Sequence, residues 1–258
     1  MPLTIQPPTH GPKFVVLKSQ RLYGDMISQH IRNYWKKAEV EVFQKGFDAL
    51  DAIQASTPDM FITGVRVDDM DGLEHLEPFI ERSLPIMVLT ARRDTRTFDM
   101  LRELRFDAAY DVKVEKLEHL SAAIEQAMTG KLYISPSFVP LLKKQKNVTL
   151  DSLTAKEMMV LSLIGDGSDD QEAAEILHLS ANTVATHRKT IMRKLKLHHK
   201  GELMMYALQE GYVYPGPNGV VHPGFDRIYK DTRSAMGAPP PVSVVSIEAG
   251  IPAVPVGS

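Results

Sequence analysis

Three aspartates stand close together after a short apolar run. Residues 58–72 read PDMFITGVRVDDMDG. Acidic side chains just past a strand are suited to holding a metal ion or accepting a phosphoryl group. A calcium-binding loop does not fit, because its first and twelfth positions would be Val67 and Pro78. We interpret the cluster as a solvated acidic turn and predict no metal site there; its members are Asp68, Asp69 and Asp71.

A second cluster of charge runs from Arg188 to Lys200. Its six basic residues are unopposed by any acid: Arg188, Lys189, Arg193, Lys194, Lys196 and Lys200. On a helix over 182–195, one face is apolar, and the opposite face presents Ala185, Thr186, Lys189 and Arg193. The major groove of DNA accepts one such helix, with exposed residues at base edges and flanking cations at phosphates. Taken alone, the run could also be a solvated basic face.

The elements that must position these clusters alternate from residue 13 to residue 130. Runs of strand length fall at 14–19, 38–43, 59–63, 85–90 and 108–112. Segments with helical spacing fall at 22–35, 46–56, 72–83, 94–105 and 115–129. Five strand-then-helix units predict a parallel sheet that is covered by helices on both faces. We therefore expect an α/β doubly wound (βα)5 domain over 13–130.

The remaining segments differ from this pattern. Residues 1–12 predict a flexible arm, and residues 131–149 a linker that includes a short helix. Residues 150–214 predict an all-α domain. Residues 215–258 are rich in proline and glycine, which predicts a disordered tail.

The all-α segment carries helix-start signals at three places. Thr154 and Glu157 have the spacing of a capping box, in which each side chain satisfies an amide of the first helical turn. Asp169 and Glu172 repeat this spacing, and Ser180 can cap the helix that carries the basic run. Short helices joined by a tight turn suggest a helix-turn-helix.

Composition narrows the classes of function. The chain of 258 residues has no cysteine, which excludes disulfides, thiolate zinc sites and cysteine nucleophiles. It has no signal-peptide core and no apolar run of about 18 residues, so we expect a cytoplasmic protein without membrane association. No phosphate-binding loop, nucleophile elbow or nucleophile–base pair is recognisable. We predict no enzymatic activity and no cofactor.

The helical segment resembles a known family. The stretches LTAKE, ILHLSANTVATHRKTIMRKL and ELMMYALQEGYV look like the LuxR-type helix-turn-helix of NarL/FixJ regulators. The resemblance implies a four-helix DNA-binding domain whose third helix enters the major groove and whose fourth, about 200–211, supports dimerisation. Carried over by position, bases would be contacted by Ala185, Thr186 and Lys189, and phosphates by Thr183, Arg188 and Arg193.

Two departures from the family pattern bear on affinity. Ala185 stands where members usually have lysine or another polar residue, and alanine can contact a thymine methyl but cannot read guanine. Asp169 and Asp170 open the second helix, where they would repel nearby phosphates. Residues 150–214 have seven Lys/Arg against nine Asp/Glu, so DNA binding could be modest or need a partner.

The preceding domain resembles the receiver of the same regulators. The resemblance implies a pair of acids that hold Mg²⁺, a phosphoacceptor aspartate, and a Ser/Thr and a Lys that contact the phosphoryl group. Aligned on MDGLE (70–74), the acid pair is replaced by Lys18 and Ser19, and the acceptor by Gly64. Thr90 and Lys113 match the remaining two positions. We expect a degenerate phosphoacceptor pocket in a pseudo-receiver.

The emptied pocket allows two interpretations of its lysines. Lys18 and Lys113, without their aspartate, could hold a small anion such as a metabolite phosphate or a cyclic dinucleotide. Alternatively, Lys18 extends its amine into water.

These patterns predict a sequence-specific transcriptional regulator that binds double-stranded promoter DNA as a homodimer or as a heterodimer with another regulator. It would act as an orphan response regulator without aspartyl phosphorylation. The alternative is a co-regulator that binds DNA weakly alone and acts as a heterodimer with another regulator. A third interpretation is a phosphorylatable switch that uses Asp68 or Asp69. Binding that falls steeply with salt would favour direct contact with DNA.

Overall fold

A parallel sheet of six strands forms the centre of the first domain. The computed structural model describes residues 11–67, 69, 76, 84–143, 153–216 and 219–225. The strands lie in the order β2-β1-β3-β4-β5-β6, and every neighbouring pair is parallel. They are β1 (Lys13–Leu17), β2 (Glu39–Phe43), β3 (Met60–Gly64), β4 (Ile86–Thr90), β5 (Ala108–Asp111) and β6 (Tyr133–Ile134). The expected doubly wound α/β architecture is confirmed.

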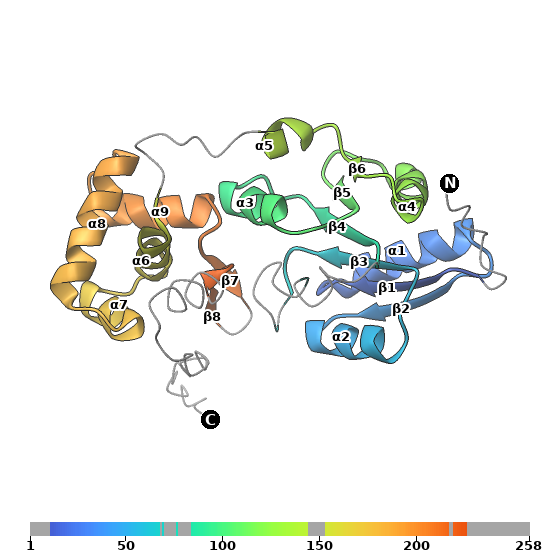
Figure 1. Ribbon diagram of the computed structural model, residues 1–258, viewed down its shortest axis with the longest axis horizontal. Coiled ribbons are helices and arrows are strands. Elements are labelled where there is room, and N and C mark those ends of the chain that lie inside the picture. Colours follow the sequence, from blue (N-terminus) through green and yellow to red (C-terminus); the bar gives the residue numbers. More distant parts are fainter. Residues whose placement is uncertain are drawn as a thin grey trace, which may run out of the picture.

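Helices cover both faces of this sheet (Figure 1). On one face α1 (Arg21–Tyr34) and α4 (Leu120–Met128), which follows the short 3-10 helix η2 (Leu117–His119), pack on a shared apolar cluster. On the other face lie α2 (Gly46–Ala55), α3 (Thr95–Glu103) and α5 (Val139–Lys143). Because β3 and β4 are buried along their whole length, they have to be apolar on both sides, as their sequences are.

The predicted linker at 131–149 begins inside this domain, which corrects its boundary. β6 pairs with β5, and Phe138 is fully buried with its ring 5.1 Å from that of Phe98 in α3. A strand of two residues is too short to show a periodic pattern, which is why the sequence did not reveal it. The helix expected at 72–83 lies outside the described residues, apart from the buried Leu76.

The second domain is helical, as expected. It contains α6 (Ala155–Gly165), α7 (Asp170–Leu177), α8 (Ala181–Leu195) and α9 (Lys200–Gln209), which share one apolar core. Both predicted capping boxes are present, at Thr154 with Glu157 and at Asp169 with Glu172. The turn between α7 and α8 is tight because His178 adopts a left-handed conformation with φ of 52°.

The start of the predicted disordered tail is folded, which is a second correction. Strands β7 (Tyr214–Gly216) and β8 (Gly219–Val221) pair antiparallel, and Phe225 is buried in the core of the helical domain. Figure 1 shows this hairpin on the side of the helical domain that faces the first domain. Residues 226–258, and residues 1–10 of the predicted arm, lie outside the described part of the chain. No helix in that part is long and apolar enough to cross a membrane.

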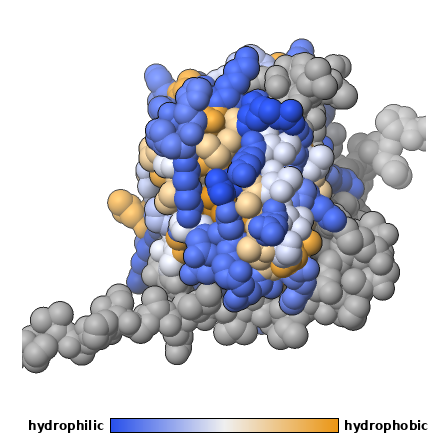
Figure 2. Space-filling view, turned by 90° about the vertical axis from the view of Figure 1, so that its left-hand side faces the viewer, coloured by the Kyte–Doolittle hydropathy of each residue, from blue (hydrophilic) through white to orange (hydrophobic). Residues whose placement is uncertain are grey.

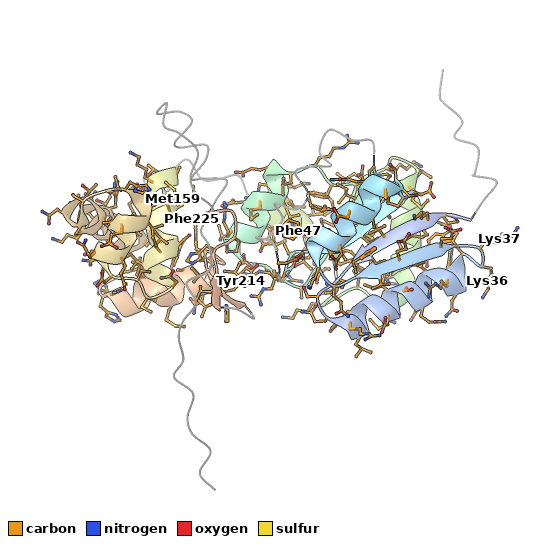
Figure 3. The ribbon with its side chains drawn as sticks, turned by 90° about the horizontal axis from the view of Figure 1, so that it is seen from below. Lys36, Lys37, Phe47, Met159, Tyr214 and Phe225 are labelled. Carbon is orange, nitrogen blue, oxygen red and sulfur yellow. The ribbon has the colours of Figure 1, made fainter. Side chains whose placement is uncertain are left out.

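The buried position of Phe138 yields a first prediction. Phe138→Ala should lower the free energy of unfolding of the first domain by about 3–5 kcal/mol, because it leaves a cavity under α3. Trp35 is the only tryptophan and packs 5.4 Å from Phe14, so its fluorescence in a urea titration reports this domain. The control is Phe47→Ala, whose side chain is exposed (Figure 3), and which should change the value by less than about 0.5 kcal/mol. Equal effects of the two substitutions would mean that 131–143 does not belong to the domain.

Candidate nucleic-acid interface and receiver-like pocket

Helix α8 presents its polar face to solvent. Ser180 caps the helix by accepting a hydrogen bond from the Thr183 amide at 3.1 Å, and Val184 and Ile191 are fully buried beneath it. The opposite face is mostly exposed, with Ala185 half-buried among exposed neighbours; it carries Thr183, Thr186, Lys189 and Arg193. The helical domain's outward side is largely hydrophilic (Figure 2). The structure therefore places five of the six predicted DNA contacts on one accessible surface.

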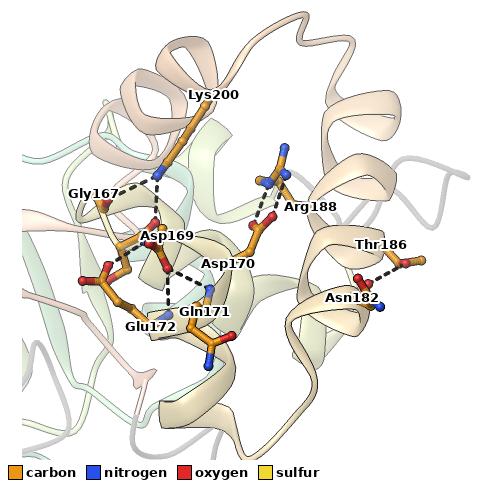
Figure 4. A network of polar contacts seen from close by, with 10 residues as sticks. Gly167, Asp169, Asp170, Gln171, Glu172, Asn182, Thr186, Arg188 and Lys200 are labelled. Carbon is orange, nitrogen blue, oxygen red and sulfur yellow. Dashed lines mark hydrogen bonds and ion pairs between the residues drawn. The ribbon is translucent and has the colours of Figure 1, made fainter.

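The sixth predicted contact, Arg188, is already paired within the protein. Its guanidinium donates two hydrogen bonds to the Asp170 carboxylate, at 2.8 and 2.7 Å (Figure 4). This bidentate contact with Arg188 holds the pKa of Asp170 below its ordinary value. Because Arg188 neutralises the charge of Asp170, Asp170 should repel nearby phosphates less than the sequence alone indicates. Asp169 is also occupied, because it accepts hydrogen bonds from the Gln171 and Glu172 amides at the start of α7.

Two more members of the basic run hold the domain together. The Lys194 amine lies 2.6 Å from the buried carboxylate of Glu157, which joins α8 to α6. Burial alone would raise the pKa of Glu157, but Lys194 and the amide and hydroxyl of Thr154 lower it below its ordinary value. Lys200 donates to the carbonyl oxygens of Gly167 and Ser168, at 3.2 and 2.9 Å, and ties α9 to the turn before α7 (Figure 4).

Three basic side chains remain available on the surface. Lys189, Arg193 and Lys196 are exposed, and none of the ion pairs among the described residues includes them. They are spaced from the middle of α8 to its C-cap. The cationic surface that α8 offers to a phosphate backbone thus consists of three charges, half of the run that the sequence shows.

The positions predicted for the degenerate phosphoacceptor pocket meet at one edge of the sheet. Lys18 and Ser19 follow β1, Gly64 ends β3, Thr90 ends β4, and Lys113 follows β5. Because these strands are parallel and adjacent, their carboxyl ends share one edge. The sequence alignment is thus consistent with the geometry.

Lys18 points toward the acceptor position instead of into water. A Cβ built on Gly64 would lie 2.9 Å from the Lys18 amine, so the lysine fills the space of a side chain at that position. Burial lowers the pKa of this amine, and none of the ion pairs among the described residues involves it. The interpretation in which Lys18 extends into solvent is wrong.

The other pocket residues have structural partners. The Ser19 hydroxyl donates to the Arg66 carbonyl oxygen at 3.1 Å, and the Thr90 hydroxyl accepts from the Arg92 amide at 3.0 Å. Lys113 is exposed, and its backbone amide donates to the Asp111 carboxylate at 3.0 Å. Its side chain therefore lies in solvent, unlike that of Lys18.

Sequence reasoning missed one buried acid at this edge. The Asp111 carboxylate is inaccessible to solvent, pairs with Arg93 and accepts a hydrogen bond from the Ser137 hydroxyl at 2.6 Å. The sequence did contain a signal for Asp111, because it is an aspartate inside an otherwise apolar strand. With these partners it ties β5 to the loops after β4 and β6.

The acidic turn after β3 supports α2 through one of its members. The Asp69 carboxylate accepts hydrogen bonds from the amides of Gly46 and Phe47, at 2.7 and 3.2 Å, at the start of α2. Asp68 and Asp71 lie outside the described residues. Within the described part of the chain, no group of three or more His, Cys, Asp or Glu side chains could hold a metal ion.

The Arg188–Asp170 pair yields a prediction with a defined pH dependence. Asp170→Asn should lower the stability of α7 and α8 by about 1–2 kcal/mol at pH 7, because it leaves the guanidinium without its charged partner. Since the pKa of Asp170 is depressed by folding, its contribution is complete above about pH 4 and is lost as the pH falls through the folded-state pKa. The difference between variant and parent should therefore shrink in acid.

Hydrogen exchange of the α7 and α8 amides measures this difference. Glu175→Gln is the matched control, because Glu175 lies on α7 but is exposed and has no cationic partner among the described ion pairs. A difference of the same size at all pH values would contradict the assignment of the stability to the ionised carboxylate.

Comparisons with known proteins agree with the two-domain geometry. Residues 20–128 match the family described as Response regulator receiver domain, and residues 151–207 match Bacterial regulatory proteins, luxR family. Response regulator protein VraR of Staphylococcus aureus (strain NCTC 8325 / PS 47) is 25% identical over 199 residues, which are 73% of this chain and 94% of VraR. VraR of Staphylococcus epidermidis (strain ATCC 12228 / FDA PCI 1200) is 26% identical with the same coverage.

Solved structures show the same fold. RcsB from Salmonella enterica serovar Typhimurium, bound to promoter DNA with a phosphomimetic, has a TM-score of 0.53 and 21% identity, covering 76% of this chain and 98% of RcsB. A structure of two RcsB dimers on two parallel DNAs has a TM-score of 0.52 and 19% identity, covering 78% of this chain and 99% of that one. The chain is therefore similar to response regulator receiver domains over residues 20–128 and to luxR-family regulatory proteins over residues 151–207.

Proposed function

We propose that this protein is a sequence-specific DNA-binding transcriptional regulator whose activity does not depend on aspartyl phosphorylation and which binds DNA as a dimer. The observation that carries the DNA-binding part is the exposed face of α8. It offers three uncommitted cations around small polar side chains, on a helix whose other face is locked into the core. This is the chemistry by which a helix docks in the major groove.

The proposed division of labour follows from exposure. Thr186 and Lys189 would reach base edges, and half-buried Ala185 would contact a thymine methyl. Thr183 and Arg193 would contact phosphates. Arg188 would stand near a phosphate but contribute less charge, since Asp170 already pairs with it. Arg188 thus acts mainly by fixing α8 against α7.

Independence from phosphorylation is supported by the residue at the phosphoacceptor position, which is the glycine that ends β3. A phosphoacceptor needs a carboxylate there and acids to hold Mg²⁺. Glycine supplies no side chain, and the Lys18 amine occupies the space where that side chain would begin. A buried cation at this place also disfavours a divalent metal ion by direct repulsion.

Dimerisation is supported by two exposed apolar side chains on α9. Met205 and Leu208 are 52% and 43% exposed, and they lie three positions apart on one helical face. A second copy packed on this face would cover them. Two copies related by a two-fold axis would present their α8 helices about 34 Å apart, one turn of DNA.

The Lys18 amine favours a second activity, the binding of a small anion at the sheet edge. It is the one predicted pocket lysine that points to the acceptor position, because Lys113 is exposed. Calorimetry with inorganic phosphate tests this activity, and Lys18→Met should abolish any heat of binding. No binding to the parent protein would remove the anion ligand from the proposal.

Lys189→Ala should weaken specific DNA binding by about 1–3 kcal/mol if Lys189 reads a base. Fluorescence anisotropy on fragments of the protein's own upstream region measures the affinity. Lys36→Ala is the matched control, since this exposed lysine lies at the far end of the receiver domain (Figure 3). Unchanged affinity of Lys189→Ala would contradict the placement of α8 in the groove, and binding only with a second regulator added would favour the heterodimer alternative.

Lys196→Ala should act differently from Lys189→Ala. A phosphate contact carries no sequence information, so affinity should fall about equally on all DNA sequences, and the salt dependence should become shallower by about one ion. Titrations at several salt concentrations give this slope. A loss of affinity on one sequence only would reassign Lys196 to base recognition.

Incubation with Mg²⁺ and a small phosphodonor should leave the protein unmodified. Intact-mass spectrometry of the treated chain should show no phosphoryl adduct, because Gly64 has no nucleophile. An adduct on Asp68, Asp69 or Asp71 would show that the acidic turn can replace the acceptor. A receiver with an intact acceptor aspartate serves as the positive control for the donor.

A further inference from the structure

The chain beyond the luxR-family match contacts the receiver domain. That match ends at residue 207, yet the described chain continues through the hairpin to Phe225. The ring of Tyr214 lies 4.0 Å from the Arg66 guanidinium and 5.4 Å from that of Arg92. Figure 3 shows Tyr214 on the side of the helical domain that faces the receiver. Tyr214 is 5% exposed, so the two arginines cover it.

Hydrogen bonds extend this contact on both sides of the tyrosine. The Arg96 amide donates to the Glu210 carbonyl oxygen at 3.0 Å, and the Thr95 hydroxyl donates to the Glu210 carboxylate at 2.5 Å. At the other end, the buried Arg96 guanidinium donates to the Pro223 carbonyl oxygen at 3.0 Å. The first turn of α3 is thus bonded to both ends of the segment formed by residues 210–216 and 219–225, which we call the strap.

Two glycines of the strap allow this close approach. Gly211 and Gly224 have φ of 80° and 71°, which favours glycine. A Cβ on Gly211 would overlap the Asp94 carboxylate, and one on Gly224 would overlap the Arg96 guanidinium. At these two positions, receiver side chains therefore occupy the space that the side chain of any residue other than glycine would need.

The strap binds the loops that also form the pocket. Arg66 follows Gly64 by two residues, and its carbonyl oxygen accepts the Ser19 hydroxyl bond at 3.1 Å. Arg92 follows Thr90 by two residues, and its amide donates to the Thr90 hydroxyl at 3.0 Å. Burial and, as the smaller cause, repulsion from Arg92 lower the pKa of Arg66. The Tyr214 ring offers both cations an electron-rich face.

We propose that the strap, residues 210–216 and 219–225, is an intramolecular docking segment that binds the carboxyl edge of the receiver and holds the two domains as one unit. The bound strap keeps α8 on the far side of the helical domain from the receiver (Figure 1). Domain arrangement is then set by a permanent contact at the edge where the resemblance to receivers implies a phosphoacceptor pocket. The consequence for DNA rests on the proposed function: the strap fixes the spacing between the two α8 helices of a dimer.

Distance measurement between spin labels tests the docking directly. The chain has no cysteine, so Lys36→Cys and Glu175→Cys place one label on each domain at exposed sites. Double electron–electron resonance on the full chain should give one narrow distance distribution. Tyr214→Ala should broaden the distribution and shift it to longer distances, because the arginines lose the ring between the domains.

A second variant changes only the receiver side. Arg66→Ala with Thr95→Val removes the nearer of the two cations at Tyr214 and the hydroxyl that bonds the Glu210 carboxylate, without touching the core of the helical domain. It should broaden the distribution in the same way. Arg21→Ala is the control, because its side chain is 81% exposed on α1, and it should leave the distribution narrow. A broad distribution in the parent, or strap variants that stay as narrow as the control, would overturn the proposal.

This measurement is made without DNA. A negative result for the strap can therefore be distinguished from a negative result for the proposed DNA-binding function. With DNA, the parent should prefer one spacing between two half-sites, and the Arg66→Ala/Thr95→Val variant should lose this preference while it keeps its affinity for one half-site. A variant that keeps the spacing preference would show that the strap does not set the geometry on DNA.

Discussion

The arrangement of parallel strands is the constraint on which the rest of the structure depends. Adjacent parallel strands bring their carboxyl ends to one edge, so the loops after β1, β3 and β4 must meet there. In this chain the meeting point holds the amine of Lys18 beside Gly64. The Lys18 amine thus occupies the position at which phosphotransfer would need a carboxylate. Under the proposed function, this edge presents a cation in place of the acceptor carboxylate.

The same edge also serves the second domain. Arg66 and Arg92, which follow β3 and β4, hold Tyr214 between the domains, and the start of α3 bonds to Glu210 and Pro223. The edge that carries the candidate pocket thus also contacts the helical domain. The pocket and the domain interface therefore share their loops.

The basic side chains of the helical domain fall into two groups, those that are paired within the protein and those that are exposed. Half of the basic run from Arg188 to Lys200 is used for folding: one side chain pairs with Asp170, one with Glu157, and one bonds to carbonyl oxygens before α7. These contacts hold α8 and α9 against α6 and α7. Only the remaining cations are free to meet phosphates, which explains how a domain with more acids than bases can still present a basic surface.

Much of the fold was readable from the sequence because its signals are local. Alternating strands and helices and both capping boxes depend on residues within a few positions of one another. They were predicted correctly, apart from the helix expected at 72–83, which lies outside the described residues. β6 was missed because two residues show no period. The hairpin was missed because its proline and glycine content resembles that of a disordered segment.

The candidate site was predicted by position but not by contact. The exposed face of α8 followed from helical spacing. The pairs Arg188–Asp170 and Lys194–Glu157 join residues 18 and 37 positions apart, and such pairing depends on how the helices cross. The direction of Lys18 could not be read either, since an amine on a long stem can turn inward or outward. Tyr214 lacked any signal, because its partners lie in another domain.

The most direct test of the account is a DNA-binding titration of the full chain with and without Mg²⁺ and a phosphodonor. Fluorescence anisotropy on the protein's own upstream region, at two salt concentrations, should show binding that weakens steeply with salt and is unaffected by the donor. Binding that appears only with the donor would contradict the account, because it would require an acceptor that Gly64 cannot provide.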